Sequence, residues 1–180
     1  FHQIKMEDLL LRGVVSPEEA NQPDFNDRTD LADKLWNMYN IDDHDMFILI
    51  SNPANNGVIV EFAKKIKEKG RKLIVVTSKA EAEASVSRHP SGKKLTDYAD
   101  LILDNCAPSP DMVVTLENGQ KINQVSTVTG NVIAQMLCAE TYRYLTGLGH
   151  DCPVLLSANV KGADVHNREI SDVYLGRWNS

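Results

Sequence analysis

Hydroxyl and amide side chains gather in one short loop that follows an apolar segment. The apolar run spans residues 46–50, and a helical pattern begins after the loop at Gly57. The polar side chains of the loop are Ser51, Asn52, Asn55 and Asn56. In a parallel α/β sheet, ligands bind at the loops that leave the carboxyl ends of strands, and the free N–H groups of the next helix attract anions. Because the loop has no charged side chain, it favours a phosphate or a sugar over a metal ion.

Three further hydroxyl side chains stand where the chain passes into a helical pattern. Ser78 follows the apolar run 72–77, and Ser126 and Thr127 open a long apolar helical segment. A hydroxyl in such a place caps the helix by accepting a backbone N–H group. Contact with a bound ligand is the alternative reading. The loop 51–56 presents the same choice, because serine and asparagine are also ordinary turn residues.

Two helix carboxylates and one histidine are the candidates for acid–base chemistry. Glu61 lies in the first turns of the helix after the loop, on its polar face. Glu140 interrupts an otherwise apolar helix, which predicts either a buried partner or a place in a site. His166 could reach a site and exchange a proton near neutral pH. We take these three as candidate catalytic residues.

A basic loop contains Arg88, His89 and Lys93. The phosphate-binding pattern G-x-x-x-x-G-K-[ST] is absent, so a solvated loop or a subunit contact is the first interpretation. An arginine or lysine in this loop could still neutralise a phosphate. His89 stands next to Pro90 and is interpreted as structural.

Strand and helix patterns alternate along the chain. Apolar runs predict strands at 46–50, 72–77, 100–104 and 112–116, and helical periodicity predicts helices at 57–69 and 126–145. This alternation is typical of a parallel, doubly wound α/β structure. The long helix is apolar almost all round, so we expect the sheet and a second subunit to bury it. The residues from Val154 onward are strand-like and then polar.

The composition excludes several classes of protein. The 180 residues are 42% hydrophobic and 24% charged with a net charge of −6, which is typical of a soluble globular domain and argues against a nucleic-acid binder. No apolar run is long enough to cross a membrane, and no signal peptide is visible, although the first residue is not Met. The three cysteines form no C-x-x-C pair, so we expect no metal and no other cofactor, and a cytoplasmic location.

Three stretches of the sequence carry a family pattern. They are residues 47–61, residues 76–100 with the run Arg88-His89-Pro90-Ser91-Gly92-Lys93, and residues 125–130 with the later 157–160 and His166-Asn167. Together they resemble the sugar isomerase (SIS) domain family over residues 31–170. The resemblance is closest to a bacterial branch of uncharacterised SIS proteins that are often labelled phosphoheptose isomerases.

This resemblance implies a fold and two competing functions. The fold is a three-layer α/β/α sandwich with a parallel, flavodoxin-like sheet, usually in a homodimer or homotetramer. The partner is a phosphorylated sugar, with no nucleic acid and no membrane involved. The first function is aldose–ketose isomerisation by a glutamate base with the help of a histidine; the alternative is a non-catalytic sugar-phosphate sensor or regulatory module. A flavodoxin-like nucleotide binder is a third hypothesis, and the absence of G-x-G-x-x-G weighs against a dinucleotide.

The sequence departs from the family pattern in two places. Residues 1–45 contain no early strand with a G-x-G-x-S-like loop, so we expect a single SIS-like domain over 1–180 that lacks its first strand–loop–helix unit. In the phosphate loop, Pro53-Ala54 replaces the Ser-Gly of the family. Proline supplies no N–H group, and alanine reaches positive φ less easily than glycine. We therefore expect weaker anion binding at this loop.

Overall fold

The centre of the molecule is a three-stranded parallel sheet. The computed structural model describes residues 2–178, with the side chains of 2–174. The strands β1 (Phe47–Ile50), β2 (Leu73–Thr77) and β3 (Leu101–Asp104) stand in the order β1-β2-β3. Phe47 pairs with Leu73, and Ile74 pairs with Leu101. The predicted parallel α/β class is confirmed by this sheet and its helices.

The helix α4 (Gly57–Glu68) connects β1 to β2 and covers one face of the sheet. Its apolar positions fall at helical spacing, so Phe62, Ala63 and Ile66 are buried against the sheet while lysines occupy the other side. Gly70 follows the helix with φ +71°, the left-handed conformation that commonly ends a helix. Short elements complete the unit before β3, namely α5 (Lys79–Ala84) and the 3-10 helix η2 (Leu95–Tyr98).

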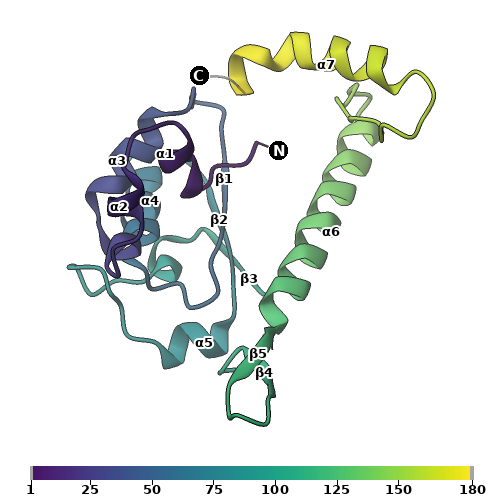
Figure 1. Ribbon diagram of the computed structural model, residues 1–180. Helices are drawn as coiled ribbons and strands as arrows, with labels where there is room; N and C mark the ends of the chain where they lie inside the picture. The colour runs from purple at the N-terminus through teal and green to yellow at the C-terminus, as the bar shows by residue number, and fades with distance from the viewer. Residues whose placement is uncertain (1, 179–180) are drawn as a thin grey trace.

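The N-terminal segment packs on the same side of the sheet as α4 (Figure 1). It contains α1 (Glu7–Leu11), α2 (Pro17–Ala20), the 3-10 helix η1 (Phe25–Asp27) and α3 (Asp30–Asn37). Leu31 and Leu35 of α3 are buried in the core. Trp36 stacks on Phe47 with ring centroids 5.5 Å apart, and it lies 5.7 Å from Phe62. Burial of these aromatic surfaces joins α3, α4 and β1 into one core.

The C-terminal part has a different architecture. The strands β4 (Met112–Thr115) and β5 (Lys121–Gln124) form a separate antiparallel hairpin, from which α6 (Val125–Gly147) leads away from the sheet and is followed by α7 (Ala163–Trp178) (Figure 1). The predicted fourth strand therefore exists but does not join the parallel sheet. The strand predicted from Val154 onward was wrong, because no strand partner reaches this segment and a loop leads into α7.

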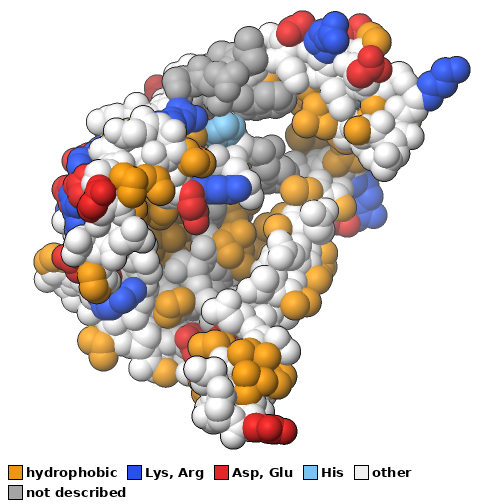
Figure 2. Space-filling model, viewed as in Figure 1, with side chains coloured by type: hydrophobic (Ala, Val, Ile, Leu, Met, Phe, Trp, Pro, Cys, Tyr) orange, Lys and Arg blue, Asp and Glu red, His pale blue; other side chains and the backbone are white. Residues whose placement is uncertain are grey.

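The apolar character of α6 is not matched by burial within the chain. Val128 is 65% exposed and Met136 is 61% exposed, whereas Gly130 is buried beside Ile50 of β1. Figure 2 shows apolar side chains on the hairpin and along this helix. The prediction that the sheet buries α6 was thus wrong for most of its length, because only its first turns reach β1. No helix in the described part of the chain is long and apolar enough to span a membrane.

We predict that Gly57→Ala destabilises the fold. A Cβ atom at Gly57 would lie 2.2 Å from the backbone oxygen of Asp27, so η1 and α4 would have to move apart. Overpacking of this kind costs about 1–3 kcal/mol. Chemical denaturation would measure the loss, and Gly147→Ala is the matched control because its Cβ would meet nothing within 4 Å. Equal effects of the two substitutions would contradict the close approach.

Candidate functional site

The carboxyl ends of the three parallel strands meet around Asn52. The hydroxyl of Thr77, at the end of β2, donates to the Asn52 carbonyl oxygen over 2.7 Å. The amide of Asn105, which follows β3, donates to Asn52 Oδ1 over 3.0 Å. The loop predicted from the sequence therefore lies at the strand ends, where ligands bind in parallel α/β sheets. Thr77 and Asn105 were missed, because only the tertiary structure brings them beside Asn52.

The second half of the loop is held by the basic loop. Asn55 donates from Nδ2 to the Val86 carbonyl over 3.0 Å, and its own carbonyl accepts the Arg88 N–H over 2.9 Å. The guanidinium of Arg88 also donates to Asn56 Oδ1. Asn55 Oδ1 is buried and has no hydrogen-bond partner among the described residues. Ala54 has φ +54°, a conformation that glycine adopts more easily.

A carboxylate of the same chain already faces the start of α4. Asp27 Oδ1 accepts the Gly57 N–H over 3.4 Å, and the Arg88 guanidinium pairs with the same oxygen over 3.2 Å. Negative charge is favourable at this end of a helix. Asp27 therefore occupies the place where an anionic ligand would be expected. Local sequence patterns do not predict this contact, since nothing in a polar loop indicates that it folds onto a helix 30 residues further on.

The other predicted hydroxyl groups lie in structural contacts. Ser78 is fully buried, donates to the Ala107 carbonyl over 2.6 Å and caps α5 by accepting the Glu81 N–H. Ser126 donates to Asp111 through both its hydroxyl, over 2.5 Å, and its N–H, over 2.8 Å. Thr127 is exposed in the first turn of α6. Of the two readings of Ser78, the structure shows the capping role directly.

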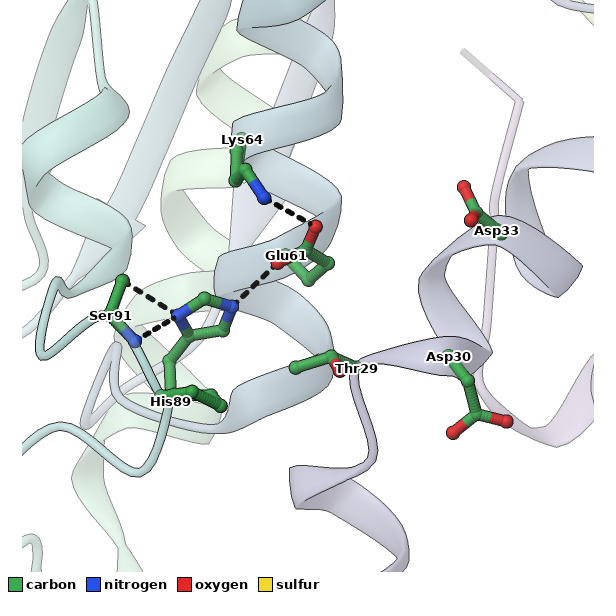
Figure 3. Close-up of a pocket in the computed structure, with 8 residues that line it drawn as sticks. Thr29, Asp30, Asp33, Glu61, Lys64, His89 and Ser91 are labelled. Atoms are coloured by element: carbon green, nitrogen blue, oxygen red, sulfur yellow. Dashed lines mark hydrogen bonds and ion pairs between the residues drawn. The ribbon is translucent and has the colours of Figure 1, made fainter.

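Glu61 lies on a surface hollow of about 590 Å³ beside α3 and α4 (Figure 3). The lining includes Asp30, Asp33, Glu61, Lys64, His89 and Ser91. Glu61 accepts from the Lys64 ammonium over 2.9 Å and contacts His89 Nε2 over 2.6 Å. Burial alone would raise the pKa of Glu61, but the hydrogen bonds from Lys64 and His89 outweigh it and hold the pKa below its ordinary value of 4.5. The group is therefore a carboxylate at neutral pH.

The other two candidate catalytic residues lie on separate elements. The Glu140 side chain on α6 is 65% exposed and pairs with Arg143 over 2.7 Å. His166 on α7 is exposed, and its Nε2 lies 2.9 Å from the Val154 carbonyl oxygen. No hydrogen bond or ion pair joins Glu61, Glu140 and His166 to one another in the described residues. Nor does that part of the chain hold a group of three or more His, Cys, Asp or Glu side chains placed to bind a metal ion.

Comparisons with known proteins match the part of the chain that contains the loop. The family model described as SIS domain matches residues 1–78, which include β1, the loop, α4 and β2. A UPF0309 protein of Halalkalibacterium halodurans is 35% identical over 176 residues, which are 94% of this chain and 72% of that protein. UPF0309 proteins of Caldanaerobacter subterraneus and Listeria innocua are 34% and 33% identical, and the matches cover 67% and 69% of their lengths. The chain therefore belongs to the UPF0309 family, and its residues 1–78 match the SIS domain model.

The family match also includes the N-terminal helices. Residues 1–30 lie inside the matched range, although the sequence analysis found no family motif there. In the structure this segment contributes Asp27 to the start of α4 and the buried Leu9 and Phe25 to the core. The N-terminal segment is therefore part of the structure that positions the loop.

We predict that Glu61→Gln lowers stability in a pH-dependent way. The folded protein holds the pKa of Glu61 below its unfolded value, so this stabilisation is present above the unfolded pKa and is lost as the pH falls through the folded pKa. At pH 7 the free energy of unfolding of the variant should be about 1.5 kcal/mol lower than that of the wild type, because a hydrogen bond to a charged group contributes about this much. The difference should shrink below about pH 4.5. Urea unfolding across pH checks this, with the exposed Glu68→Gln on the same helix as the control; a difference that does not depend on pH would contradict it.

Proposed function

We propose that this chain binds a phosphorylated sugar at the carboxyl ends of β1 and β2. The observation that carries the proposal is the loop 51–56, which leads from the end of β1 into α4 inside the SIS-matched range. Its side chains Ser51, Asn52, Asn55 and Asn56 offer hydroxyl and amide groups to hydroxyl or phosphate oxygens. Asn55 Oδ1, which is buried and has no partner among the described residues, would accept a sugar hydroxyl if the ligand opened the loop around it.

Arg88 extends this proposed site beyond the loop. It already contacts Asn55, Asn56 and Asp27, so its guanidinium lies beside the first turn of α4. Arginine binds phosphate through two parallel hydrogen bonds. The proposal therefore assigns phosphate neutralisation to Arg88, while Ser78, Ser126 and Thr127 would contribute only if a ligand displaced their present partners.

We further propose a homodimer or homotetramer, in a cytoplasmic protein, as the working assembly. The support is the exposed apolar surface of α6 and of the β4–β5 hairpin, because large apolar patches on a soluble protein mark contact sites. Covering this side would give the sheet the third layer of an α/β/α sandwich. Residues 1–180 would then act as a single SIS-like domain.

Binding without catalysis is the alternative to isomerase activity, and one observation favours it. The three candidate catalytic residues Glu61, Glu140 and His166 lie on three different helices, and Glu61 is engaged by Lys64 and His89. An isomerase needs an acid–base group within reach of the proton that it moves. A sensor or regulatory module needs only the loop at the strand ends.

We predict that sugar phosphates stabilise the protein and that the corresponding free sugars do so much less. A ligand at 100 times its Kd stabilises the folded state by about 2.7 kcal/mol, which thermal unfolding detects readily. Phosphorylated and unphosphorylated aldoses of the same configuration form the matched pairs. A panel in which no sugar phosphate raises the melting temperature would refute phosphosugar binding.

The isomerase hypothesis is tested by measuring aldose–ketose interconversion rather than ligand binding. Any aldose–ketose interconversion of a bound sugar phosphate should fall at least 100-fold in the variant that removes its acid–base group. Glu61→Gln, Glu140→Gln and His166→Asn are tested one at a time by following product formation with NMR. Activity that survives all three would remove these residues as catalytic candidates, and binding without interconversion would support the sensor module.

We predict opposite effects from the two charged groups at the start of α4. Asp27→Asn keeps an acceptor for the Gly57 N–H but removes a negative charge that competes with phosphate, so affinity should rise about tenfold, or 1.4 kcal/mol. Arg88→Met removes the cation and should lower affinity by a similar factor. Calorimetric titration with a sugar phosphate measures both, and the exposed Asp24→Asn serves as the control. A weaker affinity in Asp27→Asn would mean that Asp27 only positions Arg88.

A further inference from the structure

A serine, a histidine and a glutamate form a connected chain of hydrogen bonds at the hollow beside α4 (Figure 3). Ser91 Oγ lies 2.7 Å from His89 Nδ1, and His89 Nε2 lies 2.6 Å from Glu61 Oε2. The far oxygen of Glu61 is held by the Lys64 ammonium. Phosphosugar binding at the strand ends uses neither Ser91 nor His89, so this chain of contacts needs its own explanation.

The neighbouring backbone determines which nitrogen of His89 carries the proton. The Ser91 N–H donates to His89 Nδ1 over 3.1 Å, so Nδ1 is an acceptor and the proton of the neutral ring is on Nε2. Nε2–H then donates to the Glu61 carboxylate. The Lys93 N–H donates to Ser91 Oγ over 3.2 Å, which directs the Ser91 hydroxyl proton toward Nδ1. Nδ1 is thus the acceptor of the ring, and its lone pair is shared between the Ser91 N–H and the Ser91 hydroxyl.

Along this series of hydrogen bonds, the base is buried and the hydroxyl group is exposed, as nucleophilic chemistry requires. The His89 side chain is 5% exposed and the Glu61 side chain is 25% exposed, whereas Ser91 is exposed on the loop. A base that is buried and oriented by a carboxylate, next to an accessible hydroxyl, is the general arrangement of an activated nucleophile. It is recognised by geometry and roles rather than by sequence order. In this chain the hydroxyl meets Nδ1 and the carboxylate meets Nε2.

We propose that Ser91 is an activated nucleophile toward small acyl esters that enter the hollow. Its oxygen would attack the acyl carbonyl carbon while its proton passes to His89 Nδ1. The ester C–O bond then breaks, and the leaving alcohol takes the proton from His89. A water molecule repeats the sequence on the acyl-serine, which releases the carboxylic acid and restores Ser91.

The remaining residues of the hollow have defined contacts. Lys64 lines the same hollow, and its ammonium donates to the Glu61 oxygen that His89 leaves free. Glu61 acts through His89 as a positioning residue, because it fixes the ring tautomer and stabilises the imidazolium form. Asp30 and Asp33 line the opposite wall, where Asp30 pairs with Arg28 and Asp33 pairs with Lys65.

A labelling experiment on the intact protein tests the nucleophile directly. A fluorophosphonate probe transfers its phosphonyl group to an activated serine oxygen with loss of fluoride, and peptide mass spectrometry locates the modified residue. We expect modification at Ser91, blocked in advance by p-nitrophenyl acetate and absent in Ser91→Ala. Ser109, also exposed on a loop, is the internal control. Modification of Ser91 no greater than that of Ser109 would overturn the proposal.

Variants of the two supporting residues test the relay. His89→Gln should slow both labelling and p-nitrophenyl acetate hydrolysis about 100-fold, the usual contribution of a general base. Glu61→Gln should lower kcat more than it raises KM, because its carboxylate acts through His89. Circular dichroism at the assay temperature establishes that each variant is folded, and the wild-type labelling result stands even if one of them is not. Labelling of Ser91 that is as fast in folded His89→Gln as in the wild type would refute the relay.

This reaction is independent of phosphosugar binding. A sugar phosphate that raises the melting temperature supports the strand-end site whether or not it protects Ser91 from the probe, and the labelling of Ser91 supports or overturns the nucleophile separately. Conversely, labelling of Ser91 in a protein that binds no sugar phosphate would support the nucleophile and refute the proposed function.

Discussion

The contact between Asp27 and the first residue of α4 is the constraint on which the functional region depends. The Asp27 backbone approaches Gly57 so closely that no side chain fits between them, and its carboxylate accepts the Gly57 N–H. This contact seats the N-terminal segment on the βαβ unit. It also places a negative charge at the positive end of the helix, where it is favourable. Asp27 thus joins two parts of the fold, and its carboxylate lies at the N-terminus of α4, where an anion is favourable.

The segment between α5 and η2 connects this contact to the rest of the surface. Arg88 reaches from it to Asp27 and to the loop after β1, while His89 turns the other way and lies buried against Glu61 of α4. Neighbouring residues of one segment therefore serve the strand-end loop and the surface hollow. Because both side chains are anchored to α4, the two regions share one rigid support. A shift of α4 would alter both of them.

The local patterns of the sequence predicted the parts of the fold that depend on neighbours along the chain. The apolar runs and helical spacing between residues 46 and 77 predicted β1, α4 and β2, and the loop between them lies at the strand ends. Ser78 caps α5, one of the two roles that its place at the start of a helix suggested. In each case the relevant partner lies within a few residues or one βαβ unit, where periodicity and turn chemistry carry the information.

Local sequence patterns could not predict contacts between distant segments of the chain. The histidine that contacts Glu61 lies 28 residues further along, and His89 was interpreted from its neighbour Pro90 rather than from this partner. The apolar pattern of α6 correctly indicates surface that needs a partner, but hydrophobicity does not specify which surface provides it. In this chain Gly130 in the second turn lies beside β1, and the later side chains of the helix are exposed or half-buried. Likewise, the apolar run after Val154 predicted a strand, but the structure describes this segment as a loop before α7.

Pro53 and Ala54 affect the backbone shape of the loop and its hydrogen-bond donors in different ways. Ala54 takes φ +54°, so the backbone keeps a left-handed turn although a Cβ is present. Its carbonyl accepts the Leu95 N–H over 2.9 Å, and the Pro53 carbonyl accepts the Ser85 hydroxyl over 3.0 Å. These contacts hold the turn in a conformation that alanine alone disfavours. Proline, by contrast, cannot restore the missing N–H group. The loop thus keeps a left-handed turn without an N–H donor at Pro53. Under the proposed function, a phosphate bound there would draw more of its stabilisation from Arg88 and from the side-chain amides.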